Sequence, residues 1–274
     1  MTDFSGIFAY DFMQRAFVGG LLVSLLCSVM SLFVLLKRLA FAGIGISHAA
    51  LGGVAVGLLS GINPMLTALV VCIGTAFGIG AITHRGRVKE DTAIGILTTG
   101  IMALGVVLVG FSDAYQGDLF SYLFGNILAV SSSQLMGLFT VCLLVLGFVL
   151  LLFKELLFVS FDEEVARVTG LPAQRLYYGL LIAIACTVVA ATQVVGVVLA
   201  SALLVMPAAI GHQLARNWRG VLMISVASGW LAVGGGLLLS YLWDVASGGT
   251  IVLCLVALFF MAFLTARLRS AQPA

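Results

Sequence analysis

Long stretches without charged residues constrain this chain more than any other feature. No Asp, Glu, Lys or Arg occurs from Leu39 to Thr83, or between Arg175 and Arg216. About 20 apolar residues cross the ~30 Å hydrocarbon core of a bilayer as one helix, so these stretches predict membrane-spanning helices. Only 9% of the 274 residues are charged, against about 25% in soluble domains. We therefore expect an all-α polytopic membrane protein embedded in a lipid bilayer.

The gaps between charged residues predict nine spans, or eight if one stretch is re-entrant. The stretch between Arg175 and Arg216 fits two spans with a break near Thr192–Gln193. We expect one membrane domain, residues 1–274, with spans in the following segments: Ala16–Leu36, two within Leu39–Thr83 broken at Ser60–Pro64, Thr92–Phe111, one within Leu119–Phe153 after an interfacial segment at Leu119–Val130, two between Arg175 and Arg216, Gly220–Trp243 and Gly249–Ala266.

The basic residues predict the orientation, because Lys and Arg near span ends stay on the cytoplasmic side. With nine spans, only Arg15 falls on the other side. We therefore expect the N-terminus outside and the C-terminus in the cytoplasm. The residues that share the cytoplasmic side are Lys37, Arg38, Arg85, Arg87, Lys89, Lys154, Arg167, Arg175, Arg216, Arg219, Arg267 and Arg269.

Charge and motifs exclude several functions. The formal net charge of +2 is too small to indicate nucleic-acid binding, and we expect no such partner. The predicted spans hold no Asp, Glu, Lys or Arg at mid-membrane depth, where ion-coupled carriers usually place ionisable groups. The chain also lacks GxxxxGK[ST], the phosphate-binding loop of ATP-driven pumps. Transport by this chain is therefore passive, or a partner supplies the energy.

The second predicted span contains His48, an ionisable residue near mid-bilayer. A buried imidazole tends to stay neutral, and the neutral form binds metals. His48 is therefore either a polar packing residue or a ligand on a transport path. Small residues recur every four positions beside it and form a stripe that lets another helix approach closely: Gly45, Ala49, Gly53 and Gly57.

A second informative segment, residues 161–171, carries its own helix signals. Asp162 is a suitable N-cap, Glu163 and Glu164 complement the positive helix end, and Gly170 suits the C′ position. These signals predict a two-turn helix that either fits a groove on a soluble partner or folds against its own membrane domain. Its apolar side consists of Phe161, Val165, Val168 and Leu171.

These residues give the chain a resemblance to a known family. The sequence resembles the permease subunit of the ATP-binding-cassette importers for zinc, manganese and iron. The matching pieces run in the same order from Phe12 to about Ala266: Lys37–Phe41 leading into Ser47–Gly53, Glu90–Ile96, Tyr122–Leu128, Phe161–Leu171, Val195–Leu199 with Leu203–Ala209, and Gly248–Leu253.

The resemblance implies a type II importer permease in a bacterial or archaeal plasma membrane. It implies a homodimer, with the transport path at its interface, two cytoplasmic ATPase subunits that bind ATP, and an extracytoplasmic metal-binding protein. The chain itself would be no enzyme and bind no cofactor. Residues 161–171 would contain the helix that couples to the ATPase: Asp162, Glu163 and Glu164 would cap and orient it, Gly170 would end it, and Val165, Val168 and Leu171 would fill the partner's groove.

The sequence departs from the family pattern at two positions. Many members have an Asp four residues before the histidine of the second span, where this chain has Ile44. Many also have a proline where this chain has Ala246. Loss of a carboxylate weakens a site for manganese more than one for zinc, which accepts imidazole readily. We therefore expect zinc, with manganese or iron as alternatives, and His48 as the metal-binding residue.

Three other functions stay open. Ile44 leaves room for the same architecture with a different small cargo. An ion channel or carrier without ATP is a further alternative. An intramembrane protease would use Ser228 and His212, but Val226 stands where its GxSG pattern needs a glycine.

Overall fold

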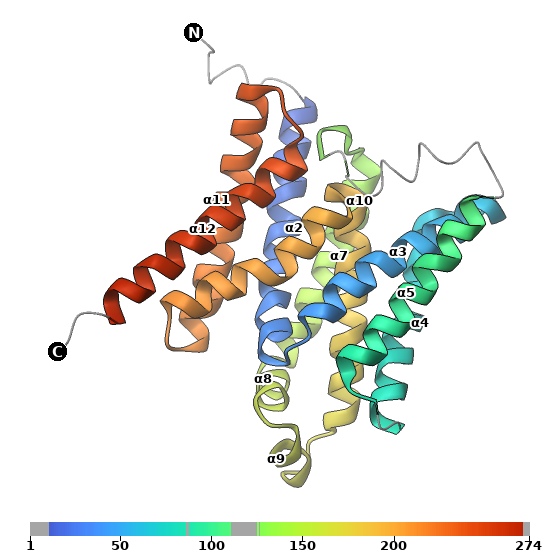
Figure 1. Ribbon diagram of the computed structural model, residues 1–274, viewed down its shortest axis with the longest axis vertical. Helices are drawn as coiled ribbons and strands as arrows, with labels where there is room; N and C mark the ends of the chain where they lie inside the picture. Colours follow the sequence, from blue (N-terminus) through green and yellow to red (C-terminus); the bar gives the residue numbers. More distant parts are fainter. Residues whose placement is uncertain (1–10, 86–87, 111–124, 126, 271–274) are drawn as a thin grey trace.

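The structure, a computed structural model, describes residues 11–85, 88–110, 125 and 127–270, and every regular element within these ranges is helical. The elements are α2 (Asp11–Leu36), α3 (Ala40–Ser60), α4 (Pro64–Arg85), α5 (Glu90–Val109), the 3₁₀ turn η2 (Ile127–Ala129), α7 (Ser132–Leu151), α8 (Phe153–Phe161), α9 (Glu163–Val168), α10 (Ala173–Leu214), α11 (Trp218–Trp243) and α12 (Ser247–Ser270) (Figure 1).

Within the described residues, eight helices are long and apolar enough to cross a membrane: α2, α3, α4, α5, α7, α10, α11 and α12. The prediction of an all-α membrane protein is confirmed. Gly61, in the left-handed region at φ 67°, ends α3 within the predicted break at Ser60–Pro64. The predicted interfacial segment at Leu119–Val130 falls largely outside the described residues, and its end forms η2.

Helix α10 has 42 residues, and a straight helix of that length would span about 63 Å, twice the hydrocarbon core. Gly196 interrupts it with φ 81° and ψ 169°, a conformation that is essentially confined to glycine. In Figure 1 the yellow first half rises from α9, and the orange second half runs obliquely back. Counted by halves of α10, the described helices make the nine predicted crossings.

The break lies three residues beyond the predicted position near Thr192–Gln193. Both residues are helical. The hydroxyl of Thr192 donates to the carbonyl of Val189 at 3.0 Å, so this polar side chain is satisfied without ending the helix. The break at Gly196 lies against Gly125, where an added Cβ would come 2.3 Å from the carbonyl carbon of Val195. Two of the motifs that carry the family resemblance therefore meet at this point.

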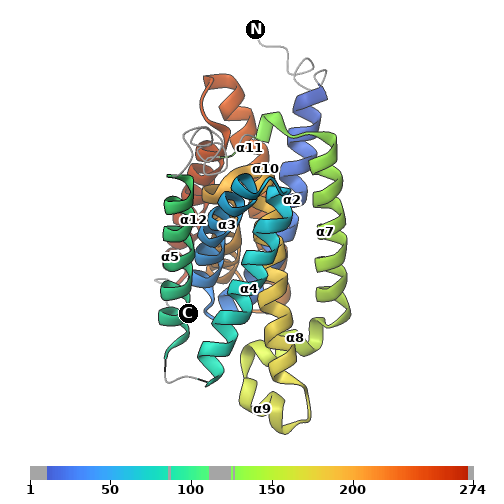
Figure 2. The ribbon, with the colours of Figure 1, turned by 90° about the vertical axis from the view of Figure 1, so that its right-hand side faces the viewer.

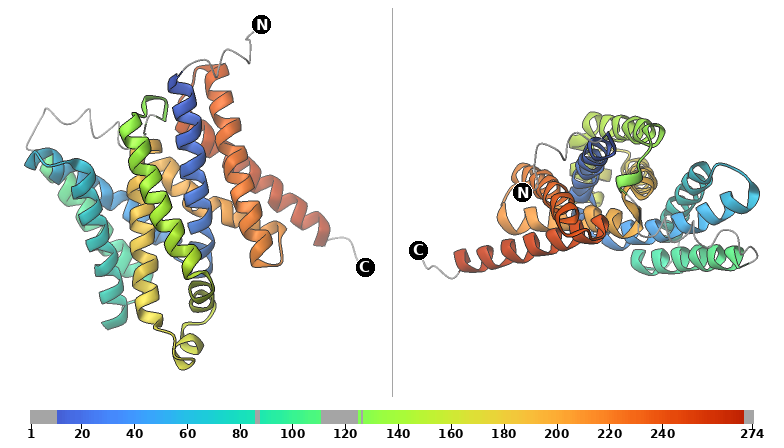
Figure 3. Two further views of the ribbon diagram at one scale, coloured as in Figure 1. Left: turned by 180° about the vertical axis from the view of Figure 1, so that it is seen from behind. Right: turned by 90° about the horizontal axis from the view of Figure 1, so that it is seen from above.

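The helices form two layers (Figures 2 and 3). Viewed from above, α3, α5, the second half of α10 and α12 lie along one side, which we call the front layer, while α2 and α7 lie behind it. Helices α8 and α9 protrude beyond the long helices at one end, which we call the α9 end. Lys37 follows the end of α2 there, whereas Arg15 lies in the first turns of α2 at the opposite end.

Candidate functional site

Helix α9 has the start and stop that its sequence predicts. Asp162 is the N-cap, and its Oδ1 accepts a hydrogen bond from the backbone of Val165 at 3.0 Å. At the other end, the N–H of Leu171 donates to Ala166 O at 3.1 Å and that of Gly170 to Arg167 O at 3.2 Å. Gly170 has φ 87°. These bonds form a Schellman motif, which needs a residue in the left-handed conformation.

The predicted apolar side of α9 is only partly open. Val168 is 89% exposed, Phe161 64% and Val165 47%. Leu171 is half-buried and packs against the core of its own chain, and Ala166 is fully buried in that core. The apolar surface available to a partner thus consists of Phe161, Val165 and Val168, which we call the α9 apolar surface. Leu171 anchors the segment to the membrane domain.

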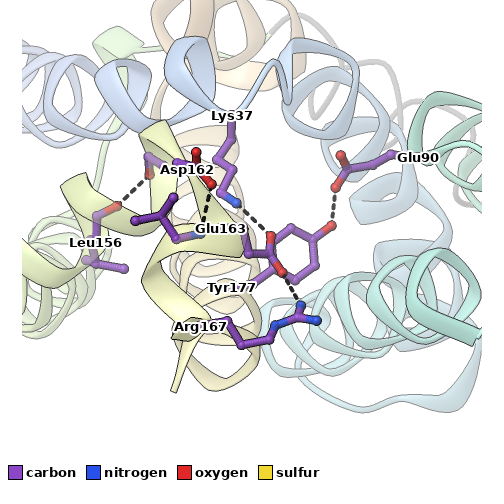
Figure 4. Close-up of polar contacts among 9 residues, drawn as sticks. Lys37, Glu90, Leu156, Asp162, Glu163, Arg167 and Tyr177 are labelled. Carbon is purple, nitrogen blue, oxygen red and sulfur yellow. Dashed lines mark hydrogen bonds and ion pairs between the residues drawn. The ribbon is translucent and has the colours of Figure 1, made fainter. Parts of the chain in front are cut away.

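The three acidic residues at the start of α9 have different surroundings. Asp162 caps the helix, and Glu164 is exposed. Glu163 bridges two cations: its Oε2 lies 2.9 Å from Lys37 Nζ and its Oε1 lies 3.0 Å from Arg167 Nη2 (Figure 4). Burial alone would raise the pKa of the Glu163 carboxyl, but the hydrogen bond and charge of Lys37 outweigh it, so this pKa lies below its ordinary value.

A lowered pKa of Glu163 predicts how stability depends on pH. The pair should contribute its full stability above the ordinary pKa of 4.5 and lose it as the pH falls through the lower, folded-state pKa. We therefore expect Glu163→Gln to lower the melting temperature of the detergent-solubilised protein by the same amount from neutral pH to about 5.5, one unit above the ordinary pKa, and by progressively less below. If this difference already shrinks between neutral pH and about 5.5, the carboxyl is not held in its charged form by Lys37.

A second polar contact at the α9 end joins α5 to α10. The hydroxyl of Tyr177 donates to the carboxylate Oε1 of Glu90, the first residue of α5. The ammonium of Lys37 lies 5.6 Å from the centre of the Tyr177 ring, within the range of a cation–π contact. Figure 4 shows the side chains of Lys37, Glu163, Tyr177 and Glu90 lying in one group. No local sequence pattern predicts this group, because its members come from four separate segments.

His48 lies in the middle of α3 and is half-buried. Its Nδ1 is buried and has no hydrogen-bond partner among the described residues. Phe41 and Ile44 lie seven and four residues before it, on the same side of the helix, and are 63% and 38% exposed. This side of α3 is therefore partly open in a single chain, and His48 lies on it half-buried, with its unpartnered Nδ1 on the buried side of the ring.

The small-residue stripe on α3 contacts two helices. A Cβ added at Gly45 would lie 2.6 Å from Cγ2 of Thr98 on α5. One added at Gly53 would lie 2.5 Å from the Cα of Ala68 on α4, and one at Gly57 would lie 2.7 Å from the Cα of Pro64. Ala49 is fully buried. The stripe thus holds α3 against α4 and α5 and fixes the helix that carries His48.

No group of three or more His, Cys, Asp or Glu side chains suited to a metal ion occurs in the part of the chain that the structure describes. In one copy, the candidate ligand at the centre of α3 is therefore His48 alone. The serine–histidine pair of the protease alternative does not form either, since Ser228 donates its hydroxyl to the carbonyl of Ser225 at 3.0 Å. His212 instead lines a pocket together with Arg216 and Trp218.

The chain matches the model of the ABC 3 transport family over residues 9–266. It is 36% identical over 266 residues to the manganese transport system membrane protein MntC of Listeria innocua, covering 97% of this chain and 95% of that protein. It is 38% identical over 257 residues to the chelated iron transport system membrane protein YfeD of Yersinia pestis, covering 94% and 86%. The structure of PsaBC from Streptococcus pneumoniae in complex with Fab superimposes with a TM-score of 0.85 at 33% identity, covering 94% of this chain and 93% of that one.

Proposed function

Because this chain belongs to the ABC 3 transport family and is the permease subunit of an ATP-driven metal importer, we propose that two copies of it enclose a path for a divalent transition metal ion. The chain moves its cargo and performs no covalent chemistry. Residues 1–274 act as one membrane domain, with the N-terminus outside and the C-terminus in the cytoplasm. ATP binds to two ATPase subunits at the α9 end, and a metal-binding protein delivers the ion at the opposite end.

One observation supports the dimer and the path together: the open side of α3 holds a polar group. Polar side chains that face lipid are unfavourable, and they usually face other protein or a water-filled cavity instead. His48 lies on the open side of α3, and Ser201 is half-buried on the second half of α10, the neighbouring helix of the front layer. Leu204 of α10 contacts α3 at Gly43. The front layer is thus the face that we assign to the second copy.

The residues beside His48 favour zinc as the cargo. Two copies would bring two imidazoles to the dimer axis, and imidazole is a good zinc ligand, whereas manganese prefers oxygen. Ile44, one turn before His48, supplies no oxygen. The relatives named for manganese and iron transport make these metals the competing candidates. An incomplete ligand set suits transport, because the ion must also leave.

His48→Ala should abolish metal uptake without affecting membrane insertion. Removing the imidazole removes the metal ligand that each copy contributes to the centre of the path. We would measure uptake of zinc, manganese and ferrous iron separately in importer-deficient cells that express the whole complex, with an ATPase-inactive partner as reference. The matched control is His212→Ala, because His212 is an exposed histidine near the end of α10.

The wild-type complex should take up zinc in preference to manganese, and only with an active ATPase. Ile44→Asp should shift this preference toward manganese, since it adds an oxygen ligand one turn from His48. Uptake that persists with the inactive ATPase would overturn ATP-driven import. Normal uptake by His48→Ala would show that the metal path does not run along α3. Preference for manganese in the wild type would overturn the assignment of zinc.

A further inference from the structure

Helix α9 is tied to the membrane helices by charge as well as by packing. Lys37 Nζ and Glu163 Oε2 lie 2.9 Å apart, and the two side chains are only 12% and 25% exposed. An exposed ion pair contributes little, but removing one partner of a half-buried pair leaves a poorly solvated charge. The position of Glu163 is therefore strongly coupled to that of Lys37.

Lys37 lies in the short turn that leads from α2 into α3. Its backbone N–H donates to Phe33 O at 3.0 Å, and that of Leu39 donates to Val34 O at 2.8 Å. Arg38 between them has φ 59°, and Leu39 is fully buried. The turn is thus held tightly to the end of α2, and α3 begins directly after it. A displacement of Glu163 would reach α3 through this turn.

A second connection runs from Lys37 to the other side of α3. The ammonium of Lys37 faces the ring of Tyr177, whose hydroxyl donates to Glu90 at the start of α5. One and two turns further along α5, Ile94 and Thr98 contact α3 at Gly45. Both connections therefore pass through Lys37, the partner of Glu163 on α9, and end at α3, the helix that carries His48.

We propose that Lys37, Glu163, Tyr177 and Glu90 form a relay that transmits the position of α9 to α3. This inference rests on the proposed function, in which the ATPases move α9. The four residues touch neither the ion nor the ATP and act as positioning residues. When the ATPases displace α9, the Lys37–Glu163 pair carries the turn before α3 with it, and the Tyr177–Glu90 bond carries α5.

The relay is tested by the number of metal ions moved per ATP hydrolysed. The purified complex is reconstituted in proteoliposomes, and zinc uptake and ATP hydrolysis are measured in the same vesicles. Lys37→Met and Glu163→Gln should each lower the ratio of uptake to hydrolysis about tenfold, a typical size for coupling between two sites, while hydrolysis changes less than about twofold. A purely structural role would lower uptake and hydrolysis together and leave their ratio unchanged.

The double variant Lys37→Met with Glu163→Gln decides whether the two residues act through one bond. We expect its ratio to be no lower than that of either single variant, whereas independent effects would multiply to about a hundredfold loss. Tyr177→Phe, which keeps the ring and removes the hydroxyl, should lower the ratio, and Tyr178→Phe is its control. Lys154→Met, an exposed lysine on α8, is the control for Lys37→Met.

Two outcomes separate the relay from the proposed function. If the wild-type complex transports zinc, manganese and iron no faster with ATP than without, the proposed function fails. If it transports with ATP but the variants keep the wild-type ratio, or the losses multiply, the relay is wrong and the proposed function stands.

Discussion

Replacing Val165 and Val168 with Asp is expected to abolish metal uptake and binding of the ATPase, while the permease still folds and inserts. Two carboxylates would then enter an apolar groove on the partner. An unpaired charge buried at an interface costs about 2–5 kcal/mol, so two cost at least about 4 kcal/mol, on the order of a thousandfold in affinity. Both valines lie on the open side of α9, and the caps of this helix at Asp162 and Gly170 remain intact.

Co-purification of the ATPase with tagged permease measures binding, and uptake in proteoliposomes measures transport. Lys154→Asp is the matched control, because it changes the net charge by the same two units at an exposed position on α8. The far-ultraviolet circular dichroism and elution volume of the variant should equal those of the wild type. Retained ATPase binding with normal uptake would show that the α9 apolar surface faces something other than the ATPase.

Local signals predicted most of the fold. A span is recognisable because the bilayer excludes charge over about 20 residues, and this rule located α2, α5 and α12 from the sequence alone. Asp162 and Gly170 likewise mark the ends of α9, because an N-cap and a left-handed C′ residue act within one or two turns.

The features that local patterns did not predict all concern contacts between distant segments. Glu163 follows the pattern of a residue that complements the helix dipole, yet its main partner, Lys37, is 126 residues away. Leu171 follows the spacing of the apolar residues on the open side of α9. The Schellman motif nevertheless turns the chain back and places Leu171 against the core. The break in α10 occurs at Gly196, where Gly125 lies close to the backbone. Thr192 is polar, which suggested a break nearby, but its hydroxyl is hydrogen-bonded within the helix.

The α3 stripe suggests a second large effect: Gly53→Ala should destabilise the protein and reduce uptake strongly. Its new Cβ would lie 2.5 Å from Ala68 Cα and 3.1 Å from Thr67 O, both backbone atoms of α4. A flexible side chain could rotate away, but here the whole of α4 must move. Overpacking of this kind costs about 3 kcal/mol, which lowers the melting temperature by about 6–12 °C.

Gly74→Ala is the matched control, since Gly74 lies on α4 with nothing within 4 Å of an added Cβ. It should leave the melting temperature unchanged or raise it slightly, because alanine favours the helix over glycine. The separation of α3 from α4 would also displace His48, five residues before Gly53. Uptake by Gly53→Ala should therefore stay low even at temperatures where the variant is fully folded. Normal uptake there would mean that the stripe stabilises the fold without fixing the metal path.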